Sequence, residues 1–314
     1  MGVMPPPVTA AQTGDDGFES QDQSGNDPRQ FSTKFMPYFR YTKLKNDLEV
    51  KELTLFGFFA FDGRFGMTYE LPIAKEIDYS DVDDFKKATK NGCPPGSGSG
   101  GLPPVQPNPG SGGNLPFDDL ECDGDNMGVG DLTLRFFLRP KSLEWSFGAN
   151  KDKNFSVLPI LEMTAPTATQ DVLGGGAYIL SPGAALVFDA PVDMMPFKLG
   201  FFAMMHFYDF SAFRDDNRGP TKRYRGRWFW MQPLAKPTEE FTVFDLTGLY
   251  MMPELQPVYD FEAGHFSAWI APEFGKIPQP GHVFYVKPGW AISPEADKGD
   301  RQFTFETGYR YFFD

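Results

Sequence analysis

Three arginines occupy every second position of one short segment: Arg223, Arg225 and Arg227. Because successive side chains of an extended chain point to opposite faces, the three guanidinium groups share one face, opposite Tyr224 and Trp228. A row of fixed cations can attract anions, and each guanidinium can also bind a carboxylate through two parallel hydrogen bonds. The chemistry that this spacing predicts is therefore the binding and steering of charge.

The same period of two, applied to the rest of the chain, predicts a larger set of charged and titratable side chains on the inner face of a sheet. The candidates are Arg135, Arg139, Glu162, Lys198, His206, Arg223, Arg225, Arg227, Asp245, Glu273, Lys287, Glu306 and Arg310. Two interpretations stay open. The charges either pair across the interior as a solvated ladder that keeps the wall rigid, or the arginine row forms a basic stripe that steers anionic solutes. Both signs are present, which argues against an ion-selective pore.

His265 and Ser267 suggest acyl-transfer chemistry, because an i, i+2 spacing places both side chains on one face of a strand. A catalytic triad also needs a third group that orients the histidine. No asparagine follows Asn217, and Gln279 lies in a proline-flanked turn, so this region offers no suitable third group. We therefore expect no catalytic residues and no enzyme.

Cys93 and Cys122 are the two cysteines of the chain, and they flank a tract rich in glycine, proline and serine. In an oxidising compartment we expect them to form a disulfide, and two free thiols are the alternative. The acidic segment 118–125 lacks the glycine and the late glutamate of a calcium-binding loop, and the 3 histidines are scattered. The sequence therefore predicts no metal site and no cofactor.

The last segment, 301–313, shows most clearly the kind of strand that positions these side chains. Phe303, Phe305 and Phe313 alternate with small or polar residues such as Thr304, and this period of two predicts a strand with one apolar and one wet face. Such a pattern is typical of a strand between lipid on the outside and a watery lumen on the inside. It also resembles the C-terminal signature of bacterial outer-membrane barrels.

Similar segments follow one another along the whole chain. The 12 predicted strands are 31–41, 47–61, 64–71, 128–139, 154–164, 176–189, 197–210, 223–234, 241–252, 265–274, 282–292 and 301–313. Even-numbered strands mostly end in short turns and odd-numbered strands in longer loops, as in an antiparallel barrel. A one-residue shift of the arginine strand would place three arginines in hydrocarbon at about 2–4 kcal/mol each, so the register is strongly determined. The predicted fold class is all-β: one antiparallel transmembrane β-barrel of about 12 strands.

Composition agrees with this fold and divides the chain into parts. The 33 Phe residues raise the aromatic content to 16%, yet no run of 18 apolar residues exists, which excludes a transmembrane helix. Residues 1–30 are polar and aperiodic and predict a disordered or loosely docked N-terminal tail, whereas 31–314 form the barrel, with a Gly/Pro-rich acidic outer loop at 72–127. Tail and loop carry most of the net charge of −13, so we expect no nucleic-acid binding by the strands.

Five prolines fall inside predicted strands, where a missing N–H interrupts the ladder: Pro159, Pro182, Pro233, Pro272 and Pro288. Each requires a bulge or a local gap. Ordinary bulges that shape the barrel are one interpretation, and a lateral opening from the lumen into the membrane is the other. The aromatic and Met-rich segment 201–205 would line such a route, or it belongs to the lipid-facing belt.

Export to an outer membrane requires a signal peptide. The first residues, MGVMPPPVTAAQ, contain neither a basic region nor an apolar core. We expect the signal to lie upstream of this numbering or to have been removed, and we predict localisation in the bacterial outer membrane.

Short motifs carry a resemblance to a known family. They are Gly-Val-Gly-Asp-Leu-Thr-Leu at 128–134, the residues Pro159, Pro166 and Thr167, and Leu-Gly-Gly-Gly at 173–176. With these motifs, residues 126–183 resemble the bacterial outer-membrane proteins of the MetA-pathway phenol-degradation type, and the similar spacing continues to the C-terminus, over about two thirds of the chain. The resemblance implies a barrel of about twelve strands that takes up aromatic or other hydrophobic compounds. It implies no catalytic residues, and the cysteine-flanked insert departs from the family pattern.

These observations predict an outer-membrane channel for the passive passage of small solutes, with hydrophobic or aromatic compounds favoured over ions. The alternative is an occluded structural barrel whose acidic loop 72–127 and N-terminal tail dock other envelope components. The expected partners are outer-membrane lipid, a small-molecule solute and, in the alternative, an envelope protein. No cofactor and no nucleic acid are expected.

Overall fold

A computed structural model describes most of the chain. The described residues are 26–44, 49–78, 125–147, 153–169, 173–174, 177–189, 200–214, 222–235, 245–261, 264–293 and 301–313. Among them, no helix is both long and apolar enough to cross a membrane. Cys93 and Cys122 lie outside these ranges, so the predicted disulfide stays a prediction.

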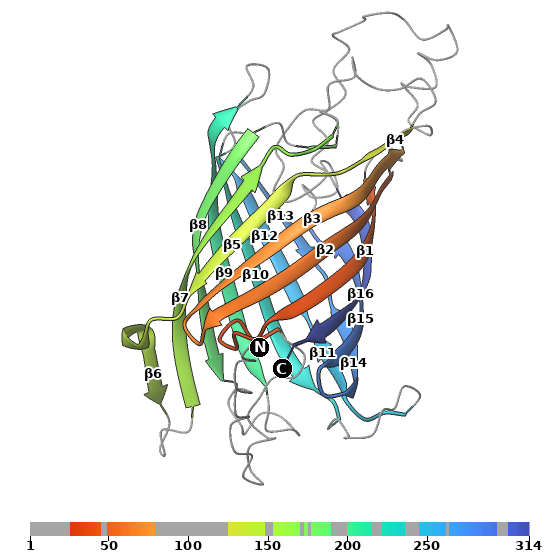
Figure 1. The fold of residues 1–314 in the computed structure, drawn as a ribbon. Coiled ribbons are helices and arrows are strands. Elements are labelled where there is room, and N and C mark those ends of the chain that lie inside the picture. Colours follow the sequence, from red (N-terminus) through yellow and green to blue (C-terminus); the bar gives the residue numbers. More distant parts are fainter. Residues whose placement is uncertain are drawn as a thin grey trace, which may run out of the picture.

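The wall is one antiparallel sheet that closes on itself. β1 (Lys34–Leu44) pairs on one side with β2 (Glu49–Asp62) and on the other with the last strand, β16 (Arg301–Phe312). Figure 1 shows the resulting cylinder of tilted strands. Closure pairs the first strand with the last, so the backbone groups at both edges of the sheet find partners, as hydrocarbon surroundings require.

The remaining strands are β3 (Phe65–Asp78), β4 (Asp125–Gly128), β5 (Leu132–Leu138), β6 (Glu144–Phe147), β7 (Lys153–Ala165), β8 (Ala177–Asp189), β9 (Phe201–Arg214), β10 (Lys222–Pro233), β11 (Leu249–Met252), β12 (Glu254–Asp260), β13 (His265–Ile270), β14 (Glu273–Gln279) and β15 (His282–Ala291). A 3-10 turn, η4 (Lys141–Leu143), separates β5 from β6. β4 and β5 both pair with β3, and β5 and β6 both pair with β7, so these three form one crossing segment. β11 and β12 together form a second crossing segment, and β13 and β14 form a third. β12 pairs with β13 and β11 pairs with β14, so the two segments lie side by side along their whole length.

The described strands therefore make 12 crossings, and the predicted antiparallel barrel of 12 strands is confirmed. We call the end of the barrel at which β1 begins and β16 ends the terminal end. The opposite end, where β3 ends and β4 begins, is the loop end (Figure 1). At the terminal end Gly281 has a φ of 83° in the tight turn between β14 and β15, a backbone conformation that glycine adopts without strain.

The predicted ninth strand is wrong. The sequence predicts it at 241–252, whereas β11 and β12 run from Leu249 to Asp260. Pro253 suggested the end of a strand because proline lacks the N–H that a ladder needs. Its carbonyl nevertheless accepts a hydrogen bond from the Trp230 backbone N at 3.1 Å, so the pairing with β10 continues past the proline.

The predicted boundary between the third strand and the long insert is wrong for the same reason. The prediction ends the strand at 71 and begins the loop at 72, whereas β3 continues to Asp78 and pairs with β4, with Lys75 opposite Gly128. Pro72 is accommodated because the register between β2 and β3 shifts next to Thr54, its partner. Residues 79–124 of the predicted loop lie outside the described residues.

The prolines predicted inside strands are part of the closed wall. Pro159, Pro182 and Pro288 each keep a register partner in a neighbouring strand, and Pro233 pairs with Tyr250. Pro272 lies between β13 and β14, which share one crossing. The wall therefore accommodates these residues locally, and a lateral opening stays a hypothesis.

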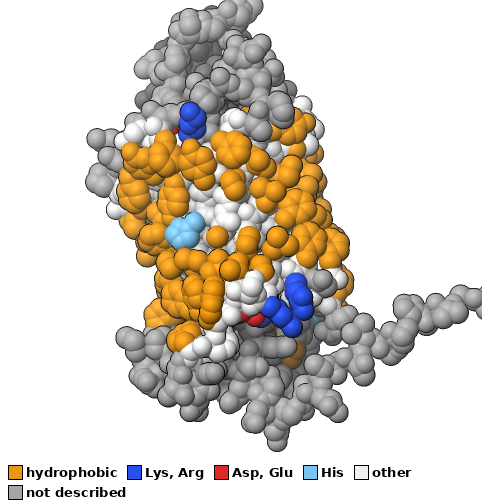
Figure 2. Space-filling view, turned by 90° about the vertical axis from the view of Figure 1, so that its left-hand side faces the viewer, with side chains coloured by type: hydrophobic (Ala, Val, Ile, Leu, Met, Phe, Trp, Pro, Cys, Tyr) orange, Lys and Arg blue, Asp and Glu red, His pale blue; other side chains and the backbone are white. Residues whose placement is uncertain are grey.

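The outer face of the barrel is apolar. Phe39, Phe284 and Trp290 are exposed by 40%, 44% and 45% of their surface. Figure 2 shows hydrophobic side chains in a broad band across the middle of one face, with lysine and arginine side chains above and below it. Apolar residues that face outward and alternate along each strand with inward residues are typical of a barrel surrounded by lipid.

Candidate functional site

The lumen holds a cavity of about 280 Å³. Its lining comes from strands all around the wall and from the segment that precedes β1. The charged side chains of the strands that line it are Lys34, Arg40, Glu70, Arg135, Glu162, Arg225, Arg227, Glu254, Glu273, Lys287, Glu306 and Arg310. Aromatic and sulfur-containing side chains, among them Phe58, Phe137, Met205 and Phe207, line it as well. The cavity is therefore both charged and apolar.

On one side of the lumen the charges form a continuous chain of ion pairs. Asp209 accepts hydrogen bonds from Arg223 at 3.0 Å and from Arg225 at 2.6 Å. Arg225 also donates to Glu162 at 2.6 Å, and Glu162 accepts a second guanidinium from Arg135 at 2.7 Å. These residues lie on β5, β7, β9 and β10, so the pairs span five consecutive crossings, with β8 between β7 and β9.

The chain of charges continues on the next strands. The Glu254 carboxylate of β12 accepts from Arg227 at 2.9 Å and from Lys287 at 2.8 Å. Gln256 donates to the same carboxylate at 2.6 Å. Two cations thus share one carboxylate at the wall formed by β10, β12 and β15.

Further pairs lie on β1, β14 and β16, beside Lys287 of β15. Arg40 binds Glu306 at 2.9 Å and lies 3.5 Å from Glu52. Arg310 binds Glu273 at 2.8 Å, and the Tyr250 hydroxyl donates to the same carboxylate at 2.7 Å. The charges of the interior are therefore paired along the wall, between strands that are adjacent or separated by one or two crossings. We call these groups together the ionic band: Arg40, Glu52, Arg135, Glu162, Asp209, Arg223, Arg225, Arg227, Glu254, Glu273, Lys287, Glu306 and Arg310.

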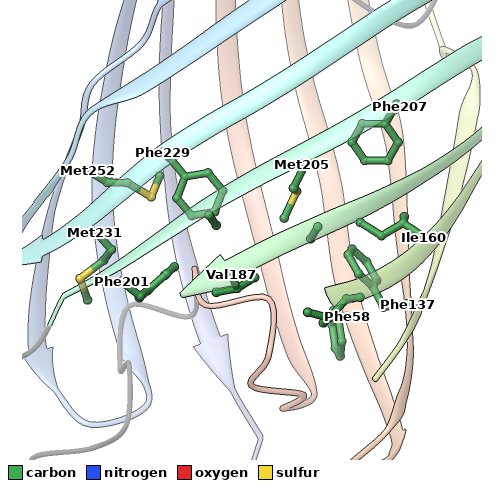
Figure 3. Packing of buried hydrophobic residues seen from close by; sticks show 13 residues of the cluster. Phe58, Phe137, Ile160, Val187, Phe201, Met205, Phe207, Phe229, Met231 and Met252 are labelled. Atoms are coloured by element: carbon green, nitrogen blue, oxygen red, sulfur yellow. The ribbon is translucent and has the colours of Figure 1, made fainter. Parts of the chain in front are cut away.

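Towards the terminal end the lumen becomes apolar. A cluster of buried hydrophobic side chains, which we call the apolar cluster, consists of Phe58, Phe137, Leu158, Ile160, Ala185, Val187, Phe201, Ala203, Met205, Phe207, Phe229, Met231 and Met252. Figure 3 shows Phe207, Met205, Phe229 and Met231 projecting from their strands into the interior. These side chains are apolar, so their polarity alone does not show whether they face the lumen or the lipid. The alternation of inward and outward positions along β9 and β10 shows that they face the lumen.

The segment before β1 enters the lumen at the terminal end. Asn26 donates to Glu273 at 3.1 Å, and Arg29 binds Asp189 at 2.6 Å. The Arg139 guanidinium donates to the backbone oxygen of Arg29 at 2.8 Å. Burial by itself would lower the pKa of Arg29, but the hydrogen bonds and charges of Asp27 and Asp189 hold that pKa above its ordinary value.

Phe31 continues this segment into the apolar cluster. Its ring centroid lies 5.4 Å from that of Phe58 and 6.4 Å from that of Phe137. Asn26, Asp27, Pro28 and Gln30 belong to the lining of the cavity. Residues 26–31 therefore occupy part of the lumen and narrow it.

The structure places most of the predicted lumen residues around the cavity. Those that line it are Arg135, Glu162, Arg225, Arg227, Glu273, Lys287, Glu306 and Arg310. Arg223 faces inward next to Asp209, beyond the cavity, and Arg139 lies at the terminal end, where it binds Glu144 at 2.8 Å. Lys198 lies outside the described residues.

Two predicted lumen residues lie elsewhere. His206 is on the outer face, because the inward positions of β9 are Ala203, Met205 and Phe207; its Nδ1 is 2.7 Å from the Tyr224 hydroxyl. Asp245 lies in the turn before β11, where it binds Lys276. The prediction assigned polar residues inward, whereas the backbone alternation decides which side of the wall a residue occupies.

The motifs of the family resemblance meet at the loop end. A Cβ atom at Gly128 would lie 2.1 Å from the Thr169 Oγ1, and one at Gly174 would lie 2.5 Å from the Asp131 Oδ1. Lys75 donates to the backbone oxygen of the buried Leu173 at 2.8 Å. These glycines are therefore required for close packing of the segment after β7 against the start of β5, which gives the motifs a structural explanation.

Of the two residues suggested for acyl transfer, the structure describes the side chain of one. Ser267 is buried on β13, and the side chain of His265 lies outside the described residues. Within the described part of the chain no group of three or more His, Cys, Asp or Glu side chains could hold a metal ion. The arrangement can bind and orient charged and apolar groups.

No protein-family model and no curated protein sequence matches the chain. Solved structures are similar in fold. An outer-membrane channel from Pseudomonas putida F1 aligns with a TM-score of 0.55 at 13% identity, over 97% of this chain and 100% of that chain. The NanC porin aligns with a TM-score of 0.50 at 8% identity, over 89% of this chain and 99% of that chain. This likeness of fold and the apolar outer face place the protein in the bacterial outer membrane.

Proposed function

We propose that the protein is an outer-membrane channel for the passive passage of small solutes, with hydrophobic or aromatic solutes favoured. The observation that carries the proposal is the cavity of about 280 Å³ inside the closed wall, bordered by the rings of Phe58, Phe137 and Phe207. Small-molecule sites usually have volumes of about 300–1,000 Å³, so this cavity suits a solute at the small end of that range.

The similarity in fold to an outer-membrane channel supports passage through the lumen. The resemblance to the MetA-pathway phenol-degradation type supports an aromatic or other hydrophobic solute, and we infer that the chain is a distant member of that group. Charges of both signs are paired around the lumen, and such a wall does not favour ions of one sign as a ring of like charges would.

Liposome swelling tests the proposal. Liposomes that contain the purified protein are expected to take up phenol faster than glycerol, after correction for the rates in protein-free liposomes. Equal corrected rates for the two solutes would contradict the preference for aromatic compounds. Rates equal to those of protein-free liposomes for both solutes would contradict passage altogether.

One observation favours a second function, an occluded structural barrel. Residues 26–31 and the apolar cluster together fill much of the lumen at the terminal end. In this function the insert between β3 and β4 and the N-terminal tail dock other envelope components. A variant that lacks 79–124 and a variant that lacks 1–31 separate the two functions: faster swelling with either supports a channel, and absent swelling with the full chain and both variants supports the structural barrel.

A further inference from the structure

The cavity has a cationic border and an apolar border, and they meet on β9 and β10. Arg225 is the register partner of Phe207, and Arg227 is the register partner of Met205. The Arg225 guanidinium carbon lies 5.2 Å from the centre of the Phe207 ring. Because cross-strand partners have neighbouring side chains on the same face, a bound molecule can touch a cation and an apolar surface at the same time.

The cations of the cavity lining outnumber its carboxylates by one. The cations are Lys34, Arg40, Arg135, Arg225, Arg227, Lys287 and Arg310, and the carboxylates are Asp27, Glu70, Glu162, Glu254, Glu273 and Glu306. A further carboxylate, Asp209, binds Arg225 from outside the lining but also binds Arg223. The lining as a whole therefore carries one more positive than negative charge, which a single bound carboxylate would balance.

Arg227 is the most exposed cation among Arg135, Arg225, Arg227 and Lys287. Its side chain is 35% exposed, whereas that of Arg225 is 13% exposed and that of Lys287 is 11% exposed. Its partner Glu254 also accepts from Lys287 and Gln256, so that carboxylate stays hydrogen-bonded when Arg227 turns toward another anion. Arg227 can therefore exchange or share its carboxylate at a low cost.

We propose that the cavity binds small aromatic carboxylates, with the carboxylate on Arg227 and the ring against Met205 and Phe207. A planar guanidinium recognises a carboxylate through two parallel hydrogen bonds, and the neighbouring apolar side chains remove the ring from water. The volume of about 280 Å³ accepts a molecule with one ring and one carboxylate. This proposal rests on the proposed channel function and specifies its class of substrate.

Equilibrium dialysis of radiolabelled benzoate and its neutral isostere benzamide against the full chain in lipid nanodiscs tests the proposal. Benzoate is expected to bind saturably and about tenfold more tightly than benzamide. Arg227→Gln is expected to lower the affinity for benzoate about tenfold and to change the affinity for benzamide less than about twofold. Equal affinities of the native chain for the two probes, or an unchanged benzoate affinity in the variant, would overturn it.

Lys51→Gln is the matched control. Lys51 lies on the outer side of β2, paired with Glu76, so its substitution removes the same charge away from the lumen and is expected to leave both affinities unchanged. If Arg227→Gln does not fold, Lys287→Gln takes its place; it removes the other cation of Glu254 and is expected to lower benzoate affinity about threefold to tenfold. An unchanged benzoate affinity in Lys287→Gln would then overturn the proposal.

Liposome swelling, run in parallel, distinguishes the two proposals. Swelling with phenol, combined with equal affinities for benzoate and benzamide, would overturn the carboxylate site and leave the channel. Saturable, Arg227-dependent benzoate binding without swelling for any solute would leave the site and overturn the channel.

Discussion

The ionic band and the apolar cluster are built on the same strands and are stabilised by different forces. β10 contributes Arg225 and Arg227 to the band and then Phe229 and Met231 to the cluster, all at inward positions. In the band, the buried carboxylates of Glu162, Asp209 and Glu254 each bind two cations, so the loss of one carboxylate leaves desolvated charge behind. In the cluster, the loss of a side chain leaves empty space. For the proposed channel, we therefore expect the band to select the solutes and the cluster to limit their size.

The largest effect on stability is expected from Asp209→Asn in the ionic band. Asp209 is fully buried and binds both Arg223, which is 1% exposed, and Arg225. Removal of the shared negative charge is expected to lower the free energy of unfolding by about 3–5 kcal/mol. Urea unfolding in lipid vesicles, followed by tryptophan fluorescence, measures the change. A variant as stable as the native chain would show that ion pairing does not hold the band.

Phe229→Ala, in the apolar cluster, is expected to change both the stability and the passage of solutes. Phe229 is almost completely buried, and its loss is expected to cost about 3 kcal/mol and to enlarge the lumen, so that small neutral solutes pass faster. Urea unfolding and liposome swelling measure the two effects. Phe284→Ala on the lipid-facing side is the matched control and is expected to leave swelling unchanged. Equal swelling rates for the two variants would contradict the idea that the apolar cluster, unlike the lipid-facing side chains, limits passage.

Arg29→Ala is expected to affect passage more than stability. Arg29 pairs with the partly exposed Asp189 and with the buried Asp27, so its loss is expected to cost about 1–3 kcal/mol. It also holds residues 26–31 in the lumen, and single-channel recordings are expected to show a larger conductance in the variant. Asp189→Asn removes one of the two carboxylates that bind Arg29 and is expected to change the conductance in the same direction. An unchanged conductance in both variants would show that other contacts hold this segment.

The smallest effect is expected from Asp245→Asn. Asp245 pairs with Lys276 outside the lumen and is 43% exposed, so solvent weakens the pair and the expected cost is about 0–1 kcal/mol. Urea unfolding measures it beside Asp209→Asn. Similar costs for the two variants would contradict the idea that burial makes the ionic band sensitive.

Much of the fold could be predicted because alternation is a local property. The inward row Arg223, Arg225 and Arg227 and the outward stripe of β16 follow from a period of two, which any strand imposes. The ninth strand was predicted in the wrong place because Pro253 removes one N–H without ending the pairing. His206 was assigned inward because it is polar, although its neighbours in β9 show the opposite parity.

The sequence by itself determined that the chain forms alternating strands, and which charged residues share a face, because both depend only on the backbone and on neighbouring positions. Only the tertiary structure decided that Asp209 serves Arg223 and Arg225, that Glu254 serves Arg227 and Lys287, and that residues 26–31 lie inside the lumen. Such partners are far apart in the chain. They meet only after the register of every strand and the closure of the barrel are set, and these depend on the whole sheet.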